Sequence, residues 1–204
     1  MYAAVRAAAP GCESETCSTF RRARDRLFRT HPDTPLEPTD RPTFGGLSYY
    51  PYDAPWRVLA VPEEDVPRES HAVQLAGDGR VEFTRVAEVH FTCPVGPATL
   101  NLYWIEGYGG GLFLPFGDAT AGRGTYGGGR YLIDTIKGAN LGLGGGRALI
   151  LDFNYAYNPS CVYSPQWGCP LTPKENWLGF EVPVGERVFK GRDVARSDEM
   201  RRGA

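Results

Sequence analysis

The sequence predicts a mainly β protein, an antiparallel sandwich or partly closed barrel with one N-terminal helix. Apolar and polar residues alternate with period 2 from Val81 to Phe91, and turn residues separate other short apolar runs. No helical pattern alternates with these runs, as it would in a parallel α/β sheet. A chain of 204 residues is long enough for one domain with a sizeable core.

The amino-terminal part should be organised differently from the rest. We expect disorder over residues 1–14 and a helix over 15–30, where apolar residues recur near one face. His31-Pro32 should end this helix, because a residue that precedes proline is disfavoured in the α region. A proline-rich arm over 31–42 then leads into the sheet.

Short strands should fill the remainder of a single β-rich domain over 15–190. Val81, Phe83, Ala87, Val89 and Phe91 should share one face of the sheet. A charged tail over 191–204 should follow. The strands are expected at 44–50, 56–61, 81–91, 100–104, 112–116, 130–136, 148–154 and 181–189.

Charge and cysteine usage limit the partners. A net charge of −2 gives no basic field for nucleic acid, and no apolar run approaches the roughly 20 residues of a membrane helix. Five cysteines suit a reduced, cytoplasmic protein better than a disulfide scaffold. The stretch before Cys12 is broken by Arg6, so we do not expect a lipid anchor there.

Glycine is concentrated where a binding site is expected. Fifteen of the 26 glycines fall between Gly107 and Gly146, interleaved with acids and tyrosines. Such density suits positive φ angles and close backbone approach. Gly122–Gly127 matches G-x-G-x-x-G, but a strand-like segment follows it where a dinucleotide site needs a helix, so we expect a turn. The sequence leaves any cofactor unknown.

Three acids are candidates for catalysis. Asp152 lies inside an apolar strand, where a carboxylate must be paired, hydrogen-bonded or placed at a cavity. Asp118 or Glu175 could be its partner in acid–base work or in holding a cation. The alternative is a structural ion pair with an arginine such as Arg130.

Other polar residues are candidates for ligand binding. Arg130 could offer a bidentate fork to a carboxylate or phosphate, and tyrosine hydroxyls could contact the same ligand. The tyrosines could equally cover the core. The candidates are Tyr126, Arg130, Asn154, Tyr157 and Asn158.

Cys161 and Cys169 are close enough in sequence to act together. A structural zinc site usually pairs cysteines two to four residues apart and needs four ligands, so these two are weak metal candidates. Two buried thiols or a reversible disulfide are the favoured alternatives.

Separate blocks of the chain resemble domain-of-unknown-function family 1684, which occurs in bacteria and archaea. The blocks lie between about Phe28 and Phe189 and read FGGLSYYPYDAPWRV, LYWIEGYGGGLFLPFGDAT, TYGGGRYL, LDFNYAYNPSCVYS, CPLTPKENWL and VGE. Gly117 and Gly124 depart from the family pattern. The resemblance implies that 103–178 is the functional region, and it implies no substrate or mechanism. The matching residues are Asp118, Thr125, Tyr126, Arg130, Tyr131, Asp152, Asn154, Tyr157, Asn158, Cys161, Cys169, Pro170, Glu175 and Asn176.

Three hypotheses about function follow. The first is a soluble domain that binds a small polar ligand in a pocket lined by Gly, Asp, Arg, Asn and Tyr. The second is a hydrolase or lyase that uses Asp152 as its base. The third is a structural or interaction protein in which the polar residues brace the interior.

Overall fold

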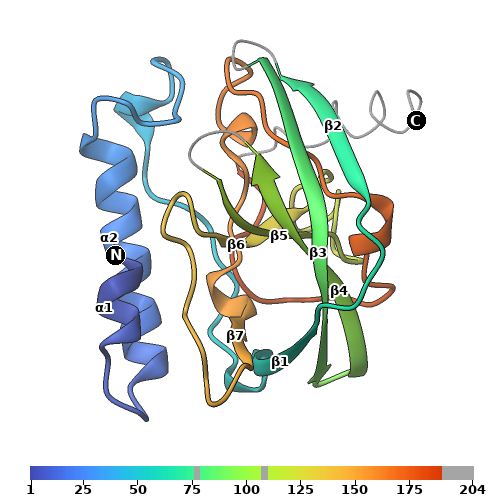
Figure 1. Ribbon diagram of the computed structural model, residues 1–204. Helices are drawn as coiled ribbons and strands as arrows, with labels where there is room; N and C mark the ends of the chain where they lie inside the picture. Colours follow the sequence, from blue (N-terminus) through green and yellow to red (C-terminus); the bar gives the residue numbers. More distant parts are fainter. Residues whose placement is uncertain (76–78, 107–109, 190–204) are drawn as a thin grey trace.

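A curled antiparallel sheet dominates the protein. The structure is a computed structural model and describes residues 1–75, 79–106 and 110–189 (Figure 1). Seven strands lie in this part of the chain, so the mainly β, partly closed barrel class is confirmed. The strands are β1 (Arg57–Glu63), β2 (Ser70–Leu75), β3 (Gly79–Cys93), β4 (Gly96–Glu106), β5 (Gly111–Phe116), β6 (Arg130–Asp134) and β7 (Leu149–Asp152).

The sheet curls until its two edges approach each other. The strand order is β6-β5-β4-β3-β1-β7, and β2 also pairs with β3. Just beyond β7, Tyr157 exchanges two backbone hydrogen bonds with Tyr131 of β6, at 2.9 and 3.0 Å. This contact joins β6, at one edge of the sheet, to the segment that follows β7, at the other edge. The sheet therefore forms a half-barrel.

A bulge in β3 changes which face its side chains occupy. The register shifts between Arg85, which pairs with Tyr103, and Ala87, which pairs with Leu102. One extra residue in a strand reverses the face to which later side chains point. The prediction of one shared face is therefore wrong: Val81 and Phe83 pack in a different cluster from Ala87, Val89 and Phe91.

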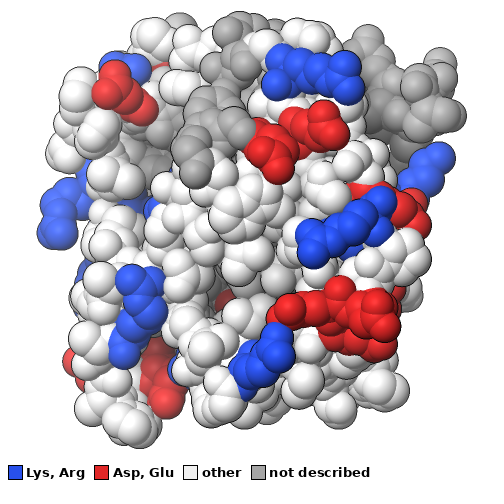
Figure 2. Space-filling model, viewed as in Figure 1, with Lys and Arg blue, Asp and Glu red and all other residues white. Residues whose placement is uncertain are grey.

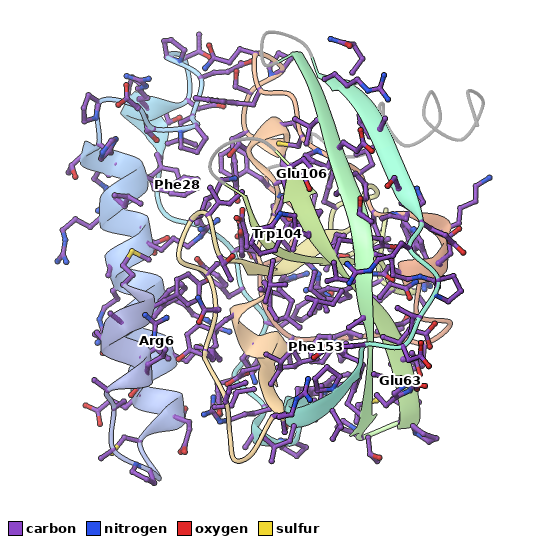
Figure 3. All side chains as sticks on the ribbon, viewed as in Figure 1. Arg6, Phe28, Glu63, Trp104, Glu106 and Phe153 are labelled. Atoms are coloured by element: carbon purple, nitrogen blue, oxygen red, sulfur yellow. The ribbon has the colours of Figure 1, made fainter. Side chains whose placement is uncertain are left out.

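Apolar clusters consequently lie on both faces of the sheet. The main core contains Phe153, whose ring centroid lies 5.2 Å from that of Phe116 and 5.9 Å from that of Trp56 (Figure 3). The second core lies on the opposite face, next to the bulge. Its buried members are Val81, Phe83, Tyr103, Ile105, Phe113, Tyr131, Ala139 and Tyr157.

Two helices flank the half-barrel, α1 (Tyr2–Arg6) and α2 (Glu13–Thr30) (Figure 1). The second helix agrees with the predicted segment 15–30 to within two residues. The first falls in residues 1–14, where we expected disorder. The Tyr2 ring packs on Phe20 at 4.8 Å, and Arg6 donates to the Asn140 carbonyl at 2.8 Å (Figure 3), which explains why this short segment is ordered.

Some expected strands are irregular segments. The backbones of residues 44–50 and 181–189 pair at an isolated bridge between Tyr49 and Glu186 and form no ladder, and Pro183 cannot donate to one. β2 was not predicted, because it is a short strand whose side chains from Ser70 to Gln74 are half-exposed or exposed. The predicted tail over 191–204 lies outside the described residues. Short 3-10 helices occupy Arg41–Thr43, Ala54–Trp56, Phe153–Tyr155, Ser160–Val162 and Lys174–Asn176.

The surface carries mixed charge. Acidic and basic side chains are interspersed on the face shown in Figure 2. Within the described ranges, no helix has the length and apolar character needed to cross a bilayer.

Asn176 joins two neighbouring strands through its side chain. Its amide accepts from the Asn101 N–H at 2.8 Å and donates to the carbonyls of Asn101 at 2.9 Å and Pro115 at 2.7 Å. The residue is fully buried. It therefore satisfies backbone groups of β4 and β5 that have no access to water.

We expect Asn176→Ala to lower the free energy of unfolding by roughly 2–4 kcal/mol, because it strands buried backbone groups. Urea denaturation measures the change. Lys174→Ala, in the same turn but exposed, is the control and should change stability by less than about 0.5 kcal/mol. Equal stability of the two variants would show that the bridge contributes nothing.

Candidate functional site

Asp118 and Arg130 form a buried ion pair. Arg130 Nη2 lies 2.8 Å from Asp118 Oδ2, and both side chains are almost wholly excluded from solvent. Asp118 Oδ1 also accepts from the backbone N–H and the hydroxyl of Thr120, at 2.8 and 2.6 Å. The sequence reasoning thus named two residues that do meet. Asp118 and Arg130 contact each other, and neither lines the cavities described below.

Arg130 also holds the carboxyl-terminal segment of the described chain. Its guanidinium donates to the carbonyls of Val182 at 2.9 Å, Glu186 at 3.3 Å and Val184. Burial lowers the pKa of Arg130, and the neighbouring Asp118 opposes that shift. These contacts are those of an internal brace, so the predicted ligand-binding role of Arg130 stays a prediction.

Asp152 and Asn154 form a second buried group. Asp152 Oδ1 accepts from the backbone N–H of Asn154 at 3.0 Å and from its side-chain amide at 2.9 Å. Arg57 Nη1 lies 3.3 Å from Asp152 Oδ2. Burial raises the pKa of Asp152 above its usual range, although Asn154 and Arg57 act to lower it. A cavity of about 250 Å³ borders Arg57, and its lining includes Glu13 and Tyr155.

Asn158 belongs to a third buried group, centred on the carboxylate of Glu186, which was not predicted from the sequence as a site residue. Buried Glu186 accepts from the Asn158 amide at 3.2 Å and from the Tyr163 hydroxyl, and it forms an ion pair with Arg24 at 3.1 Å. Glu186 was visible in the sequence only as part of the VGE block. The sequence near Glu186 gave no indication of its partner, because Arg24 lies 162 residues earlier in the chain, on α2.

The remaining candidates are dispersed. Tyr157 donates to Asp134 Oδ2 at 3.3 Å, and Tyr126 is buried with its hydroxyl 4.0 Å from Cys161 Sγ. Glu175 is exposed, apart from the buried acids, so Asp118, Asp152 and Glu175 are not brought together as one site.

Cys161 and Cys169 do lie together, as two thiols. The Cys161 N–H donates to Cys169 Sγ at 3.3 Å. The pKa of Cys169 is lowered to about 7, chiefly by a hydrogen bond from the Cys161 thiol and less by backbone N–H groups and the charge of Lys137, while burial acts in the opposite direction. No cluster of three or more His, Cys, Asp or Glu side chains suited to a metal occurs in the described part of the chain.

Cys169 borders a cavity of about 240 Å³, which we call the Cys169 cavity. Its floor comes from the second core, so the bulge in β3 helps to form it. Asp134 and Lys137 lie at its wall and pair at 3.5 Å. The indole N–H of Trp167 is buried and has no protein acceptor among the described residues. The lining residues are Val81, Ile105, Phe113, Tyr131, Asp134, Ile136, Lys137, Ser160, Trp167, Gly168, Cys169 and Pro170.

Fold and cavity together define a β-rich half-barrel with a flanking helical layer and a small cavity lined in part by one member of a thiol pair, Cys169. The chain belongs to the family described as Protein of unknown function (DUF1684), whose model matches residues 42–187. It is also similar to an uncharacterized protein of Haloarcula marismortui solved by NMR. Identity is 33%, coverage is 85% of this chain and 92% of that chain, and the TM-score is 0.60. Comparison with curated proteins gave no match.

Arg130→Met should lower the free energy of unfolding by about 3–5 kcal/mol, because it leaves Asp118 buried without its partner. Arg123→Met is the matched control, since its ion pair with Glu181 is exposed on both sides. Equilibrium denaturation compares the two. If Arg130→Met were as stable as the wild type, Arg130 would have no bracing role, and ligand binding would be the better explanation of this residue.

Asp152 should give stability a specific pH dependence. The pKa of Asp152 is raised in the folded protein. At pH values just above the ordinary pKa of 3.8, the folded protein therefore keeps the Asp152 proton, whereas the unfolded chain has lost it. The Asp152 contribution to the free energy of unfolding therefore falls as pH rises through that range.

Asp152→Asn should remove this fall, whereas Asp53→Asn, at an exposed acid close by, should keep it. Denaturant titrations between about pH 3.5 and 6 test the difference. Identical pH slopes for the wild type and Asp152→Asn would contradict the assignment.

Proposed function

We propose that this protein binds a small molecule and that the Cys169 cavity receives it. The observation that carries the proposal is an apolar hollow with a few polar groups at its wall, which is the usual composition of a ligand site. A volume of about 240 Å³ suits a small metabolite. This cavity differs from the polar pocket that the sequence suggested. The Asp, Arg and Asn side chains expected to line that pocket form hydrogen bonds within the protein instead.

The lining favours a ligand with an apolar body and an anionic group. Val81, Ile105 and Phe113 offer apolar contact. The Lys137 ammonium and the Trp167 N–H can both donate to a carboxylate, and neither can accept a hydrogen bond. Asp134 already pairs with Lys137 and would orient it.

A carboxylate-dependent hydrolase or lyase is the second proposal. It rests on Asp152, a buried acid with a raised pKa, whose partner Arg57 borders a separate cavity of about 250 Å³. An acid that keeps its proton at higher pH can act in proton transfer. Neither Asp118, which is paired with Arg130, nor exposed Glu175 supplies the partner acid that the sequence suggested.

Small aromatic and branched aliphatic carboxylates should bind in the Cys169 cavity. Titration into ¹⁵N-labelled protein should shift the amide signals of residues around Lys137 and Cys169. Val81→Phe should abolish these shifts because the larger ring fills the cavity floor. Val61→Phe, at an exposed strand position, should retain them.

The charge preference can be tested separately. Lys137→Met should weaken a carboxylate about tenfold, equivalent to about 1.4 kcal/mol, and should leave the matching primary amide nearly unchanged. Carboxylates that shift signals only elsewhere, or that bind Val81→Phe as well as they bind the wild type, would refute the proposal.

A further inference from the structure

Cys169 lines the cavity, and its contact with Cys161 is a geometry that ligand binding does not require. Cys169 Sγ receives the backbone N–H of Cys161 at 3.3 Å, and Lys137 lines the same cavity. An N–H donor and a nearby cation both stabilise a thiolate over a thiol. Cys169 is half-buried and borders the cavity, so a small reagent can reach it.

We propose that Cys169 and Cys161 form a peroxide-reactive thiol pair, in which Cys169 is the attacking thiolate and Cys161 is the resolving thiol. The substrate class is a hydroperoxide, either hydrogen peroxide or a small organic hydroperoxide that fits the cavity. The apolar floor formed by the second core suits the organic portion of the latter.

Selectivity among the cysteines supports this assignment. The pKa of Cys169 is lowered to about 7, chiefly by the hydrogen bond from Cys161, and this favours the thiolate. Burial instead raises the pKa of Cys17 to about 11. Cys93 is buried in the main core and does not line the Cys169 cavity.

The reaction balances with the peroxide as the oxidant. The Cys169 thiolate attacks the peroxide oxygen, an S–O bond forms and the O–O bond breaks. The departing alkoxide or hydroxide takes a proton from water. Cys161 then attacks Cys169 Sγ, an S–S bond forms and the S–O bond breaks, and the released hydroxide combines with the Cys161 proton as water. Two thiols lose two electrons in total; an organic hydroperoxide is reduced to an alcohol and water, and hydrogen peroxide is reduced to two waters.

Ring closure needs little rearrangement of the chain. Bonded sulfurs lie about 2.05 Å apart. The Cys161 N–H and the Cys161 thiol both contact Cys169 Sγ, so the two sulfurs are neighbours before oxidation. The loop between them carries Trp167 and Gly168, which line the cavity, so the disulfide would fix part of the cavity wall.

The test treats the reduced full-length protein with one equivalent of hydrogen peroxide and maps the products by mass spectrometry. We expect one internal disulfide between Cys161 and Cys169, with loss of two hydrogens. Cys161→Ala should stop at a sulfenic acid on Cys169, which dimedone traps. Cys169→Ala should form neither product. Cys12→Ala, at an exposed thiol, should react as the wild type does.

A second readout measures the thiolate directly. The rate of Cys169 alkylation by iodoacetamide should rise with pH to a midpoint of about 7, and Cys161→Ala should slow it at neutral pH by roughly tenfold. Modification of Cys12 before Cys169, or equal oxidation rates in the Cys169→Ala and Cys12→Ala proteins, would overturn the proposal. These readouts follow thiols rather than carboxylate binding, so either proposal can fail alone.

Discussion

The packing of residues 181–189 against the half-barrel depends on the hydrogen bonds and the ion pair of the buried Arg130 guanidinium. Residues 181–189 cross the main core without a ladder partner, because Pro183 lacks an N–H and Gly185 adopts a φ of +78°. Carbonyls in such a segment need donors away from water. Arg130 supplies them to Val182, Val184 and Glu186, and Asp118 compensates its charge.

A second charged contact continues from this segment to the helices. Holding the backbone at Glu186 directs the Glu186 carboxylate towards Arg24 of α2 and towards Asn158 and Tyr163. The barrel, the irregular chain after β7 and the helical layer therefore meet at one buried acid. Residues distant in the sequence are thus joined by the Arg24–Glu186 ion pair and by the hydrogen bonds from Arg130 to the carbonyls of residues 182, 184 and 186.

The sequence predicted the fold class well and the partners of the polar residues only in part. Alternation identified β3 and β4, and the helical pattern identified α2, because those signals depend on nearest neighbours. Asp152 and Asn154 meet because they are two residues apart. The contact between Arg24 and Glu186 spans most of the chain, and no local pattern encodes it. Asp118 and Arg130 were recognised as a possible ion pair, but the three carbonyls that make Arg130 a brace come from an irregular segment that the pattern presented as a strand.

The bulge in β3 explains why the Cys169 cavity was invisible to pattern analysis. Strict period-2 reasoning assigns one buried face to the whole strand, whereas the register shift between Arg85 and Ala87 buries side chains on both faces. That shift contributes Val81 and Phe83 to the second core, and the Cys169 cavity lies between this core and the segment that carries Cys169. A thiol placed there has an apolar floor on one side and Lys137 on the other. The cavity thus places a thiol beside apolar side chains and an exposed lysine, an arrangement that strict alternation along β3 does not predict.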